Sequence, residues 1–395
     1  MPNDLLLQNV RVSGGEPADV LVHDGWIERI GPGLTARPDV PILDGGSRVL
    51  LPGFVDAHSH LDKSLLGMPW YSREPGRSLH RTIADERALR LAPDWDYERQ
   101  IGRNVEVLVA AGTTHTRAFV DIDLDAKLAG LEGMLAVKDK YAHALDMQII
   151  AFAQSGIAAH PGTAELLDSA LAAGADVIGG LDPCLVERDP VTNLDLLFGL
   201  AGKHGKGVDI HLHEPGPLGA FSAELIIERT RATGMGGQVV ISHPDFLGGI
   251  GEPQAGRIIE AMVEAGVAVT TNVPGSDPKP PLRRMIDAGL RMGSGCDGAL
   301  DSWGPLNRSD MLFKAYEMAW RYGLGTDDDL GLALRMVTAG GAAVMGLDDH
   351  GVEPGCRADL VLVPGQVAVE PIVALPAERT VIKAGRVVAV DGVCR

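Results

Sequence analysis

The chain has 395 residues, of which 45% are hydrophobic and 22% charged, and these proportions are ordinary for a globular protein. Its formal net charge of −18 repels phosphate backbones, which argues against nucleic acid as a partner and favours a small neutral or cationic substrate. No apolar run reaches the length of about 18 residues that a membrane-spanning helix needs, so we expect a cytoplasmic protein without a membrane partner.

Short strand-like runs dominate the first 50 residues. Residues 5–12 and 20–27 are rich in Leu, Val and Ile, and Gly, Asp and Pro interrupt this part of the chain. No long helical pattern accompanies these runs. This end of the chain therefore predicts a small β-structure.

Residues 50–60 carry the most informative motif of the chain. An apolar stretch follows the break at Pro52 and Gly53 and ends in His58-Ser59-His60, as expected for a buried strand that delivers polar groups at its carboxyl end. Two histidines at positions i and i+2 leave the same face of a strand, so both imidazoles can reach one cation. The motif predicts half of a metal site.

Strand-like runs alternate with amphipathic helical patterns between about residues 51 and 348. The helical patterns include residues 163–173, 221–232 and 254–265. This alternation is typical of βα units, and the segment is long enough for a parallel (β/α)₈ barrel of about 250 residues.

Residues 121–125 alternate Asp with Ile and Leu, which mimics the start of a calcium-binding loop. Position six of the loop is Ala126, where the sharp turn requires Gly. We therefore interpret these residues as a strand end that runs into an acidic helix N-terminus.

Three further strand ends present polar groups of the kind found in His58 and His60. They are His211 with His213 and Glu214, then His243, then Asp297. A site of three His and one Asp suits Zn²⁺ or Fe²⁺ and leaves a position for water. A (β/α)₈ barrel collects its active site from the carboxyl ends of several strands, so these positions are expected to converge.

The C-terminal stretch returns to the style of the first 50 residues. Residues 358–364 and 380–390 are strand-like and lack long helical patterns. We expect the two ends of the chain to assemble one small β-sandwich beside the barrel.

Taken together, these motifs resemble the amidohydrolase superfamily, in its cytosine deaminase-like branch, over nearly the whole chain. The resemblance is carried by the HxHLD run at 58–62, residues 151–157, His211 with Glu214, Ser242-His243, and Asp297 with Trp303. Lys63 and His213 are closer to the N-isopropylammelide amidohydrolase type within this branch. Gly298 departs from cytosine deaminases, which carry a second Asp after the metal-binding one.

The resemblance implies a (β/α)₈ barrel over residues 51–348, with a composite β-sandwich from residues 1–50 and 349–395. It implies one divalent metal, Zn²⁺ or Fe²⁺, and the ligands carried over position by position are His58, His60, His211 and Asp297. Binuclear relatives add a carbamylated lysine at the end of strand four. The corresponding run, residues 175–183, contains no lysine, so a single metal is favoured.

Three residues are candidates for catalysis. His243 would orient the water or polarise the leaving group, with a structural strand-end histidine as the alternative. Asp297 would take the proton released as water attacks, since a metal-bound carboxylate keeps a free lone pair. The resemblance gives Glu214 the role of shuttling that proton to a ring nitrogen or the departing amine. On its own, Glu214 could equally be a solvated loop carboxylate or a helix cap.

Four residues are candidates for binding the substrate. Gln154 offers a donor and an acceptor to the amide-like edge of a heterocycle. Trp303 could cover a flat ring by stacking, with a core Trp as the alternative. Lys63 and His213 are expected in the pocket, although Lys63 could instead pair with a surface carboxylate. Gly298 is expected to leave room for a bulkier ring.

The sequence therefore predicts a mononuclear metal-dependent aminohydrolase acting on a heterocycle of the cytosine, isoguanine or aminotriazine type. Metal-bound hydroxide would attack the amine-bearing ring carbon and release ammonia or an alkylamine. Hydrolysis of a cyclic amide or another ring C–N bond at the same site is the alternative, because both reactions need the same ligands. The expected partner is a small heterocyclic molecule, and a homo-oligomer is compatible with the resemblance.

Overall fold

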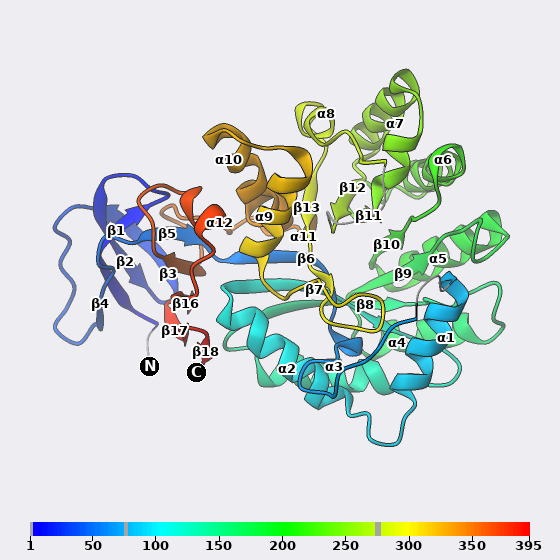
Figure 1. Ribbon diagram of the computed structural model, residues 1–395, viewed down its shortest axis with the longest axis horizontal. Helices are drawn as coiled ribbons and strands as arrows, with labels where there is room; N and C mark the ends of the chain where they lie inside the picture. The colour runs from blue at the N-terminus through cyan, green and yellow to red at the C-terminus, as the bar shows by residue number, and fades with distance from the viewer. Residues whose placement is uncertain (1–2, 75–77, 273–277) are drawn as a thin grey trace.

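A parallel sheet that closes on itself forms the centre of the molecule in a computed structural model, which describes residues 3–74, 78–272 and 278–395 (Figure 1). Its strands are β6 (Phe54–His60), β7 (Thr113–Asp121), β8 (Asp146–Phe152), β9 (Val177–Leu181), β10 (Gly207–His211), β11 (Val239–Ser242), β12 (Ala268–Thr271), β13 (Met292–Ser294) and β14 (Asp297–Gly298). Each strand pairs with the next along the chain from β6 to β13. Because β13 pairs with β12 and β14 pairs with β6, these two short strands share the eighth position and close the barrel.

Gly295 makes this closure possible. It lies between β13 and β14, where a Cβ atom would fall 2.2 Å from the backbone oxygen of His58 and 2.5 Å from its backbone nitrogen. Any side chain would therefore push the eighth strand away from β6, whereas glycine permits the close approach of the two backbones.

Helices surround the barrel, as expected for repeated βα units. They are α1 (Leu79–Arg90), α2 (Tyr97–Ala110), α3 (Ala129–Lys140), α4 (Thr163–Ala173), α5 (Pro190–His204), α6 (Gly216–Thr233), α7 (Glu252–Ala265), α8 (Leu282–Asp287), α9 (Met311–Tyr322), α10 (Asp327–Met336) and α11 (Ala339–Met345), with 3₁₀ turns η1 (Leu61–Lys63) and η2 (Pro244–Gly249). The predicted helix at 163–173 coincides with α4, and the other two lie within α6 and α7.

Apolar side chains at helical spacing hold these helices against the barrel. In α2, Ile101, Val105 and Leu108 are fully buried and face the same way along the helix. They join barrel residues such as Val120 and Ile149 in one core cluster. Within the described parts of the chain, no helix is long and apolar enough to cross a bilayer.

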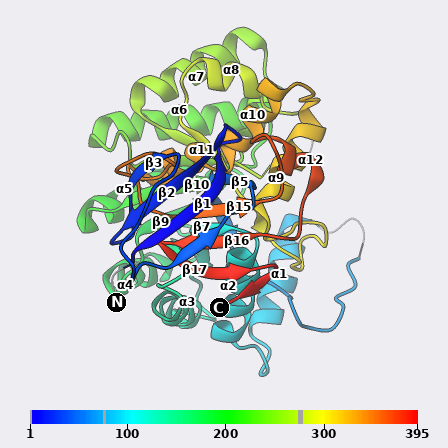
Figure 2. The ribbon, with the colours of Figure 1, turned by 90° about the vertical axis from the view of Figure 1, so that its left-hand side faces the viewer.

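Strands from both ends of the chain form a second sheet beside the barrel (Figures 1 and 2). Its members are β1 (Leu5–Val12), β2 (Pro17–His23), β3 (Trp26–Gly31), β4 (Ile42–Asp44), β5 (Val49–Pro52), β15 (Leu360–Val363), β16 (Thr380–Lys383), β17 (Arg386–Val390) and β18 (Val393–Cys394), and the short helix α12 (Glu370–Ala374) lies between β15 and β16. β5 pairs with β1 on one side and with β15 on the other, so the two ends share one hydrogen-bonded sheet. The predicted barrel and the composite β-structure from both termini are thus confirmed.

Two of the predicted strand-like runs are hairpins rather than single strands. The run 20–27 turns at Asp24 and Gly25, with φ values of 49° and 80°, and the run 380–390 turns at Ala384 and Gly385, with φ values of 46° and 77°. Two successive residues with positive φ are typical of the tight turns that join antiparallel strands.

The chain crosses between the terminal sheet and the barrel at two places. β5 ends at Pro52 in the terminal sheet and β6 begins at Phe54 in the barrel, while the return to the terminal sheet lies between Met345 and Leu360. We propose that the chain divides at these two places, close to the limits of 50 and 349 given above.

Candidate active site

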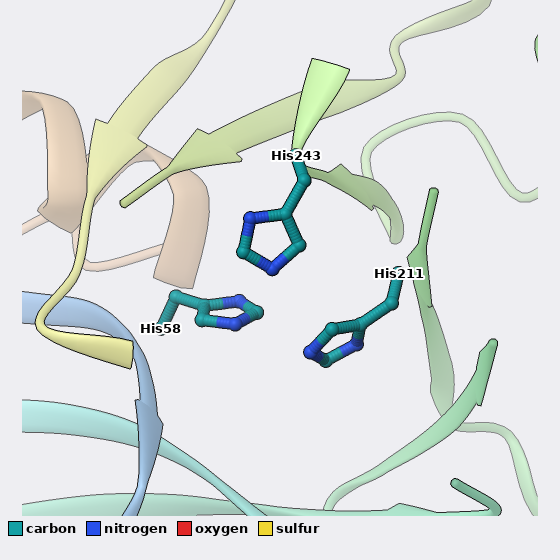
Figure 3. A group of neighbouring side chains, drawn as sticks. All are labelled: His58, His211 and His243. Atoms are coloured by element: carbon teal, nitrogen blue, oxygen red, sulfur yellow. The ribbon is translucent and has the colours of Figure 1, made fainter. Parts of the chain in front are cut away.

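Four histidines and one aspartate converge at the carboxyl end of the barrel. His58 and His60 end β6, His211 ends β10, His243 directly follows β11, and Asp297 begins β14. Ring nitrogens of His58, His211 and His243 all lie within 4.8 Å of one another, and Figure 3 shows the three imidazoles facing a common centre. Nε2 of His60 lies 3.1 Å from Nε2 of His211 and 3.3 Å from Oδ1 of Asp297, which is 3.7 Å from Nε2 of His58.

The chemistry of this cluster fits a divalent cation. Nε2 of His58, Nδ1 of His211 and Nε2 of His243 are buried and have no hydrogen-bond partner among the described residues. Burial lowers the pKa of His58 to about 4 and holds the pKa values of His211 and His243 well below the usual range, so the imidazoles are neutral. Although burial opposes ionisation, the surrounding imidazoles keep the pKa of Asp297 below its ordinary value. Neutral imidazoles and a carboxylate are the ligands that Zn²⁺ and Fe²⁺ prefer.

A chain of buried hydrogen bonds inside the barrel fixes the ring of His58. Its Nδ1 lies 3.0 Å from the hydroxyl of Ser242, which donates to Oδ1 of Asp209 at 2.7 Å. Arg117 Nε donates to the other oxygen of Asp209 at 2.9 Å. Because Nδ1 is engaged on this side, Nε2 of His58 is left to face the cluster, as metal-binding histidines require.

Three residues of the site have backbone conformations in the left-handed region. The φ values are 39° for Asp182, 64° for His243 and 59° for Asp297. Such conformations cost side-chain-bearing residues on the order of 1–3 kcal/mol each and occur preferentially at functional sites. Asn272, just beyond β12, helps to hold Asp297 in this conformation, since Nδ2 of Asn272 donates to Oδ2 of Asp297 at 2.5 Å.

The cluster borders a cavity of about 90 Å³. The structure brings eight of the predicted site residues to its wall, whereas His58 belongs to the cluster but not to the wall. The wall comprises His60, Lys63, Leu79, Phe152, Gln154, Leu181, His211, His213, His243, Asp297, Gly298, Asp301, Trp303, Gly304 and Asn307.

His213 forms a pair with Asp182 at the edge of this cavity. Asp182 Oδ1 accepts the backbone N–H of His213 at 2.6 Å, and its Oδ2 lies 3.3 Å from Nδ1 of the ring. Desolvation opposes protonation, but the hydrogen bond and the negative charge of Asp182 raise the pKa of His213. The ring also stacks on His243, with centroids 4.6 Å apart. Asp182, which directly follows β9, was not predicted, although its strand-end position is the same signal that revealed His211.

Glu214 does not lie on the cavity wall. Its Oε1 accepts the backbone N–H groups of Cys184 and Leu185 at 2.6 and 2.8 Å, and its Oε2 accepts the hydroxyl of Ser222. The side chain is fully buried, so it is also not the solvated loop carboxylate of the alternative. These bonds occupy the carboxylate in holding the segment after β9, and the expected role of Glu214 as a proton shuttle stays a prediction.

Lys63 is buried in a charged network and does not pair with a surface carboxylate. Its Nζ lies 3.0 Å from Asp121, 3.3 Å from Glu86 and 2.9 Å from Oε1 of Gln154. Burial opposes ionisation of Glu86, but the charges of Lys63 and Arg90 lower the pKa of this carboxyl to about 2. Glu86 lies on α1, outside the βα repeat, so no strand-end pattern could have revealed it.

Gly298 does not leave an open space beside Asp297, which corrects the expectation from the sequence. A Cβ atom on Gly298 would fall 1.6 Å from Oδ2 of Asp301, so the carboxyl of Asp301 fills the space that a side chain at position 298 would need. Oδ1 of Asp301 accepts the backbone N–H groups of Trp303 and Gly304 at 2.9 and 3.0 Å. Burial raises the pKa of Asp301 to about 7.

A parallel (β/α)₈ barrel with His and Asp ligands at the carboxyl ends of its strands defines the class of metal-dependent barrel hydrolases. Within that class, a model of the amidohydrolase family matches residues 42–389, and the chain belongs to this family.

Individual relatives agree with this membership over almost the whole chain. The N-isopropylammelide isopropyl amidohydrolase of Pseudomonas sp. (strain ADP) is 31% identical over 359 residues, which cover 89% of this chain and 88% of that protein. The crystal structure of N-isopropylammelide isopropylaminohydrolase from Burkholderia multivorans ATCC 17616 covers 100% of both chains with a TM-score of 0.96 and 42% identity. The 5-methylcytosine deaminase from Klebsiella pneumoniae liganded with 5-fluorocytosine covers 97% of both chains with a TM-score of 0.84 and 27% identity. The family resemblance inferred from the sequence is confirmed.

Proposed function

We propose that the protein is a cytoplasmic, mononuclear metal-dependent aminohydrolase that replaces an exocyclic amine of a nitrogen heterocycle with oxygen. One observation carries this proposal: neutral buried imidazoles and an ionised Asp297 share a cavity with the His213–Asp182 pair, whose pKa shift favours a proton on the ring. Aminohydrolysis needs both parts, since water must lose a proton to attack and the departing amine must gain one.

The residues that would hold the metal are His58, His60, His211 and Asp297. A bound Zn²⁺ or Fe²⁺ would lower the pKa of a water from about 15.7 toward about 7 and so make hydroxide available at neutral pH. β9 carries no lysine that could bridge a second metal, which supports a single cation.

The side chains of the cavity divide the proton transfers between them. Asp297 is ionised and faces the histidine cluster through Oδ1, so it can take up the proton that water loses on attack. His213 can donate a proton to the departing amine, and Asp182 stabilises the imidazolium on the opposite side of the ring. His243 stays neutral and lies against both parts of the site, where it can orient the attacking water.

The cavity wall suits a flat heterocycle with a small apolar substituent. Trp303 is 39% exposed and borders the cavity, so it is available for stacking rather than packed in the core. Leu79, Phe152 and Leu181 add apolar surface to the same wall. Since two similar proteins are named for N-isopropylammelide, we propose an oxo-triazine or oxo-pyrimidine substrate whose leaving group is ammonia or a short alkylamine.

The test is amine release by the purified protein, supplied with Zn²⁺ or Fe²⁺, from a panel of N-isopropylammelide, cytosine, isocytosine, isoguanine, creatinine and pterins. We expect release from at least one oxo-substituted ring and none from the Asp297→Ala variant. Ring opening without amine release would instead identify the cyclic-amide hydrolase and overturn the proposal, as would equal release by the variant.

A further inference from the structure

The carboxamide of Gln154 lies on the cavity wall between two ions of opposite charge. Nζ of Lys63 donates to Oε1 of Gln154 at 2.9 Å, and Nε2 of Gln154 donates to Oε1 of Glu86 at 3.2 Å. An ammonium group can only donate hydrogen bonds and an ionised carboxylate can only accept them. The two neighbours therefore determine which end of the amide is oxygen and which is nitrogen.

The opposite orientation of this amide would break two charge-assisted hydrogen bonds at once. It would place Nε2 against the ammonium of Lys63 and Oε1 against the carboxylate of Glu86. Both ions have side chains that are only 2% exposed, so water could not replace the lost bonds. Gln154 is thus held with its oxygen bonded to Lys63. Among the described residues the second hydrogen of Nε2 has no acceptor, and Gln154 borders the cavity, so this hydrogen is available to a bound ring.

Lys63 is held by residues of the protein. Its Nζ donates to Asp121 at 3.0 Å and to Gln154 at 2.9 Å, and it forms an ion pair with Glu86 at 3.3 Å. Glu86 in turn accepts from Nε1 of Trp303 as well as from Arg90 and Gln154. One carboxylate on α1 therefore holds two residues of the cavity wall, the amide and the indole.

We propose that Glu86 is a positioning residue that, with Lys63, locks Gln154 as a hydrogen-bond donor, so that the cavity selects a ring bearing an oxo group or an unprotonated nitrogen at that end. A ring presenting an N–H or amino group there would meet another N–H and lose a bond it had made with water. This inference rests on the proposed function, because it names the feature of the heterocycle that the same cavity recognises.

The first test compares Glu86→Gln with Asp85→Asn. A carboxamide at position 86 can donate or accept, so it no longer dictates how Gln154 is turned. For N-isopropylammelide and cytosine, which both carry ring oxo groups, we expect Glu86→Gln to raise KM about tenfold and to change kcat less than KM. Asp85 is the matched control, since its carboxylate lies on the same helix and pairs with Arg81 at 2.8 Å. Asp85→Asn is expected to leave both constants unchanged.

The second test exchanges the carboxylate at position 86 with the carboxamide at position 154. Gln154→Glu alone places two carboxylates side by side and should lower Tm. The double variant Glu86→Gln/Gln154→Glu restores one carboxylate and one carboxamide beside Lys63, so Tm should return toward the wild-type value. It still presents no N–H from position 154, so KM should remain raised.

These measurements separate the inference from the function on which it rests. The Tm values are measured without substrate, so they test the coupling of positions 86 and 154 even if the wild-type protein turns over neither compound. A wild-type protein that turns over neither compound would overturn the proposed substrate class alone. A Tm that does not recover in the double variant would overturn the lock between Glu86 and Gln154. An unchanged KM in Glu86→Gln, or wild-type KM in the double variant, would overturn the role of Gln154 as the required donor.

Discussion

Two groups of histidine and aspartate lie at opposite ends of the barrel, and they differ in whether a protein cation lies among their ligand atoms. At the carboxyl ends of the strands, His58, His211 and His243 bring ring nitrogens within 4.8 Å of one another. At the amino ends, where the terminal sheet packs, His115 and Asp146 meet Asp359 with the same spacing. Spacing alone would make both of them metal sites.

The second group already contains its cation, because Lys383 of β16 lies among the ligand atoms. Its Nζ is 2.6 Å from Asp146, 2.7 Å from Asp359 and 3.3 Å from His115. Within the described residues, no lysine or arginine takes that place beside Asp297, whose ion-pair contacts are with His58 and His60. Ligand atoms are available to a metal only where no protein cation already lies among them, so the second group is an ion-paired joint between sheet and barrel.

Loss of a ligand should produce the largest difference between the two groups. We expect His211→Ala to lose bound metal and to bring amine release down to background, because the cluster then lacks one of its four ligands. The matched His115→Ala variant should keep wild-type metal content, measured by elemental analysis of the purified protein. Equal metal loss in both variants would show that the two groups do not differ in metal binding.

The His213–Asp182 pair should control the alkaline side of the pH profile. Because the negative charge of Asp182 raises the pKa of His213, activity that needs the protonated ring falls as pH rises through that raised value. Asp182→Asn lowers this pKa, so the descending limb of kcat/KM should move to lower pH and the maximum should fall on the order of 10²–10⁴-fold.

Glu214→Gln is the control for that profile. Its carboxylate accepts from two backbone N–H groups and a hydroxyl, so the variant should lose about 1–3 kcal/mol of unfolding free energy. The alkaline limb should stay where it is in the wild type. A limb that moves in Glu214→Gln but not in Asp182→Asn would return the proton transfer to Glu214.

Replacement of Lys383, the cation of the second group, should reduce stability without reducing catalysis. Lys383→Met leaves Asp359, whose side chain is 3% exposed, without its partner, and breaking a buried pair in this way costs about 3–5 kcal/mol. Urea unfolding should show this loss while kcat stays near the wild-type value. For comparison, Lys138→Met removes a pair with Asp176 that is about one-third exposed, and should cost less than about 1 kcal/mol.

The smallest effect is expected from the hydrogen bonds behind the ligands. Ser242→Ala removes the hydroxyl beside Nδ1 of His58 but leaves the ligand itself in place. Partners of this kind are typically worth about 10–100-fold in metal affinity. A competition titration with a zinc chelator would measure the metal affinity of the variant. An unchanged affinity would show that packing alone orients His58.

The strand-end pattern predicted the barrel and the convergence of the strand-end histidines because both follow from local chemistry. Buried strands read as apolar runs, and His58 and His60 share a face through the period of two of a strand. The same pattern says which end of the barrel a residue occupies but not which way its side chain turns. Glu214 and its neighbour His213 were both expected in the site, and the fold shows that of the two His213 borders the cavity and Glu214 does not.

Other features depended on contacts between distant segments and could not be predicted. Glu86 reaches Trp303 across 217 residues of chain. Asp301 is close to Gly298 in sequence, but its carboxyl fills the space over Gly298 only because of the way this loop turns. The surface pairing considered for Lys63 was wrong for the same reason, since Asp121 and Glu86 approach it only after β7 and α1 are packed.

The single metal site is tested by a titration of metal-free protein with Zn²⁺ or Fe²⁺, followed by amine release from the best substrate of the panel. We expect activity to rise from background and to reach its plateau at one metal per chain. A plateau at two metals per chain, or full activity before any metal is added, would exclude a mononuclear metal-dependent enzyme.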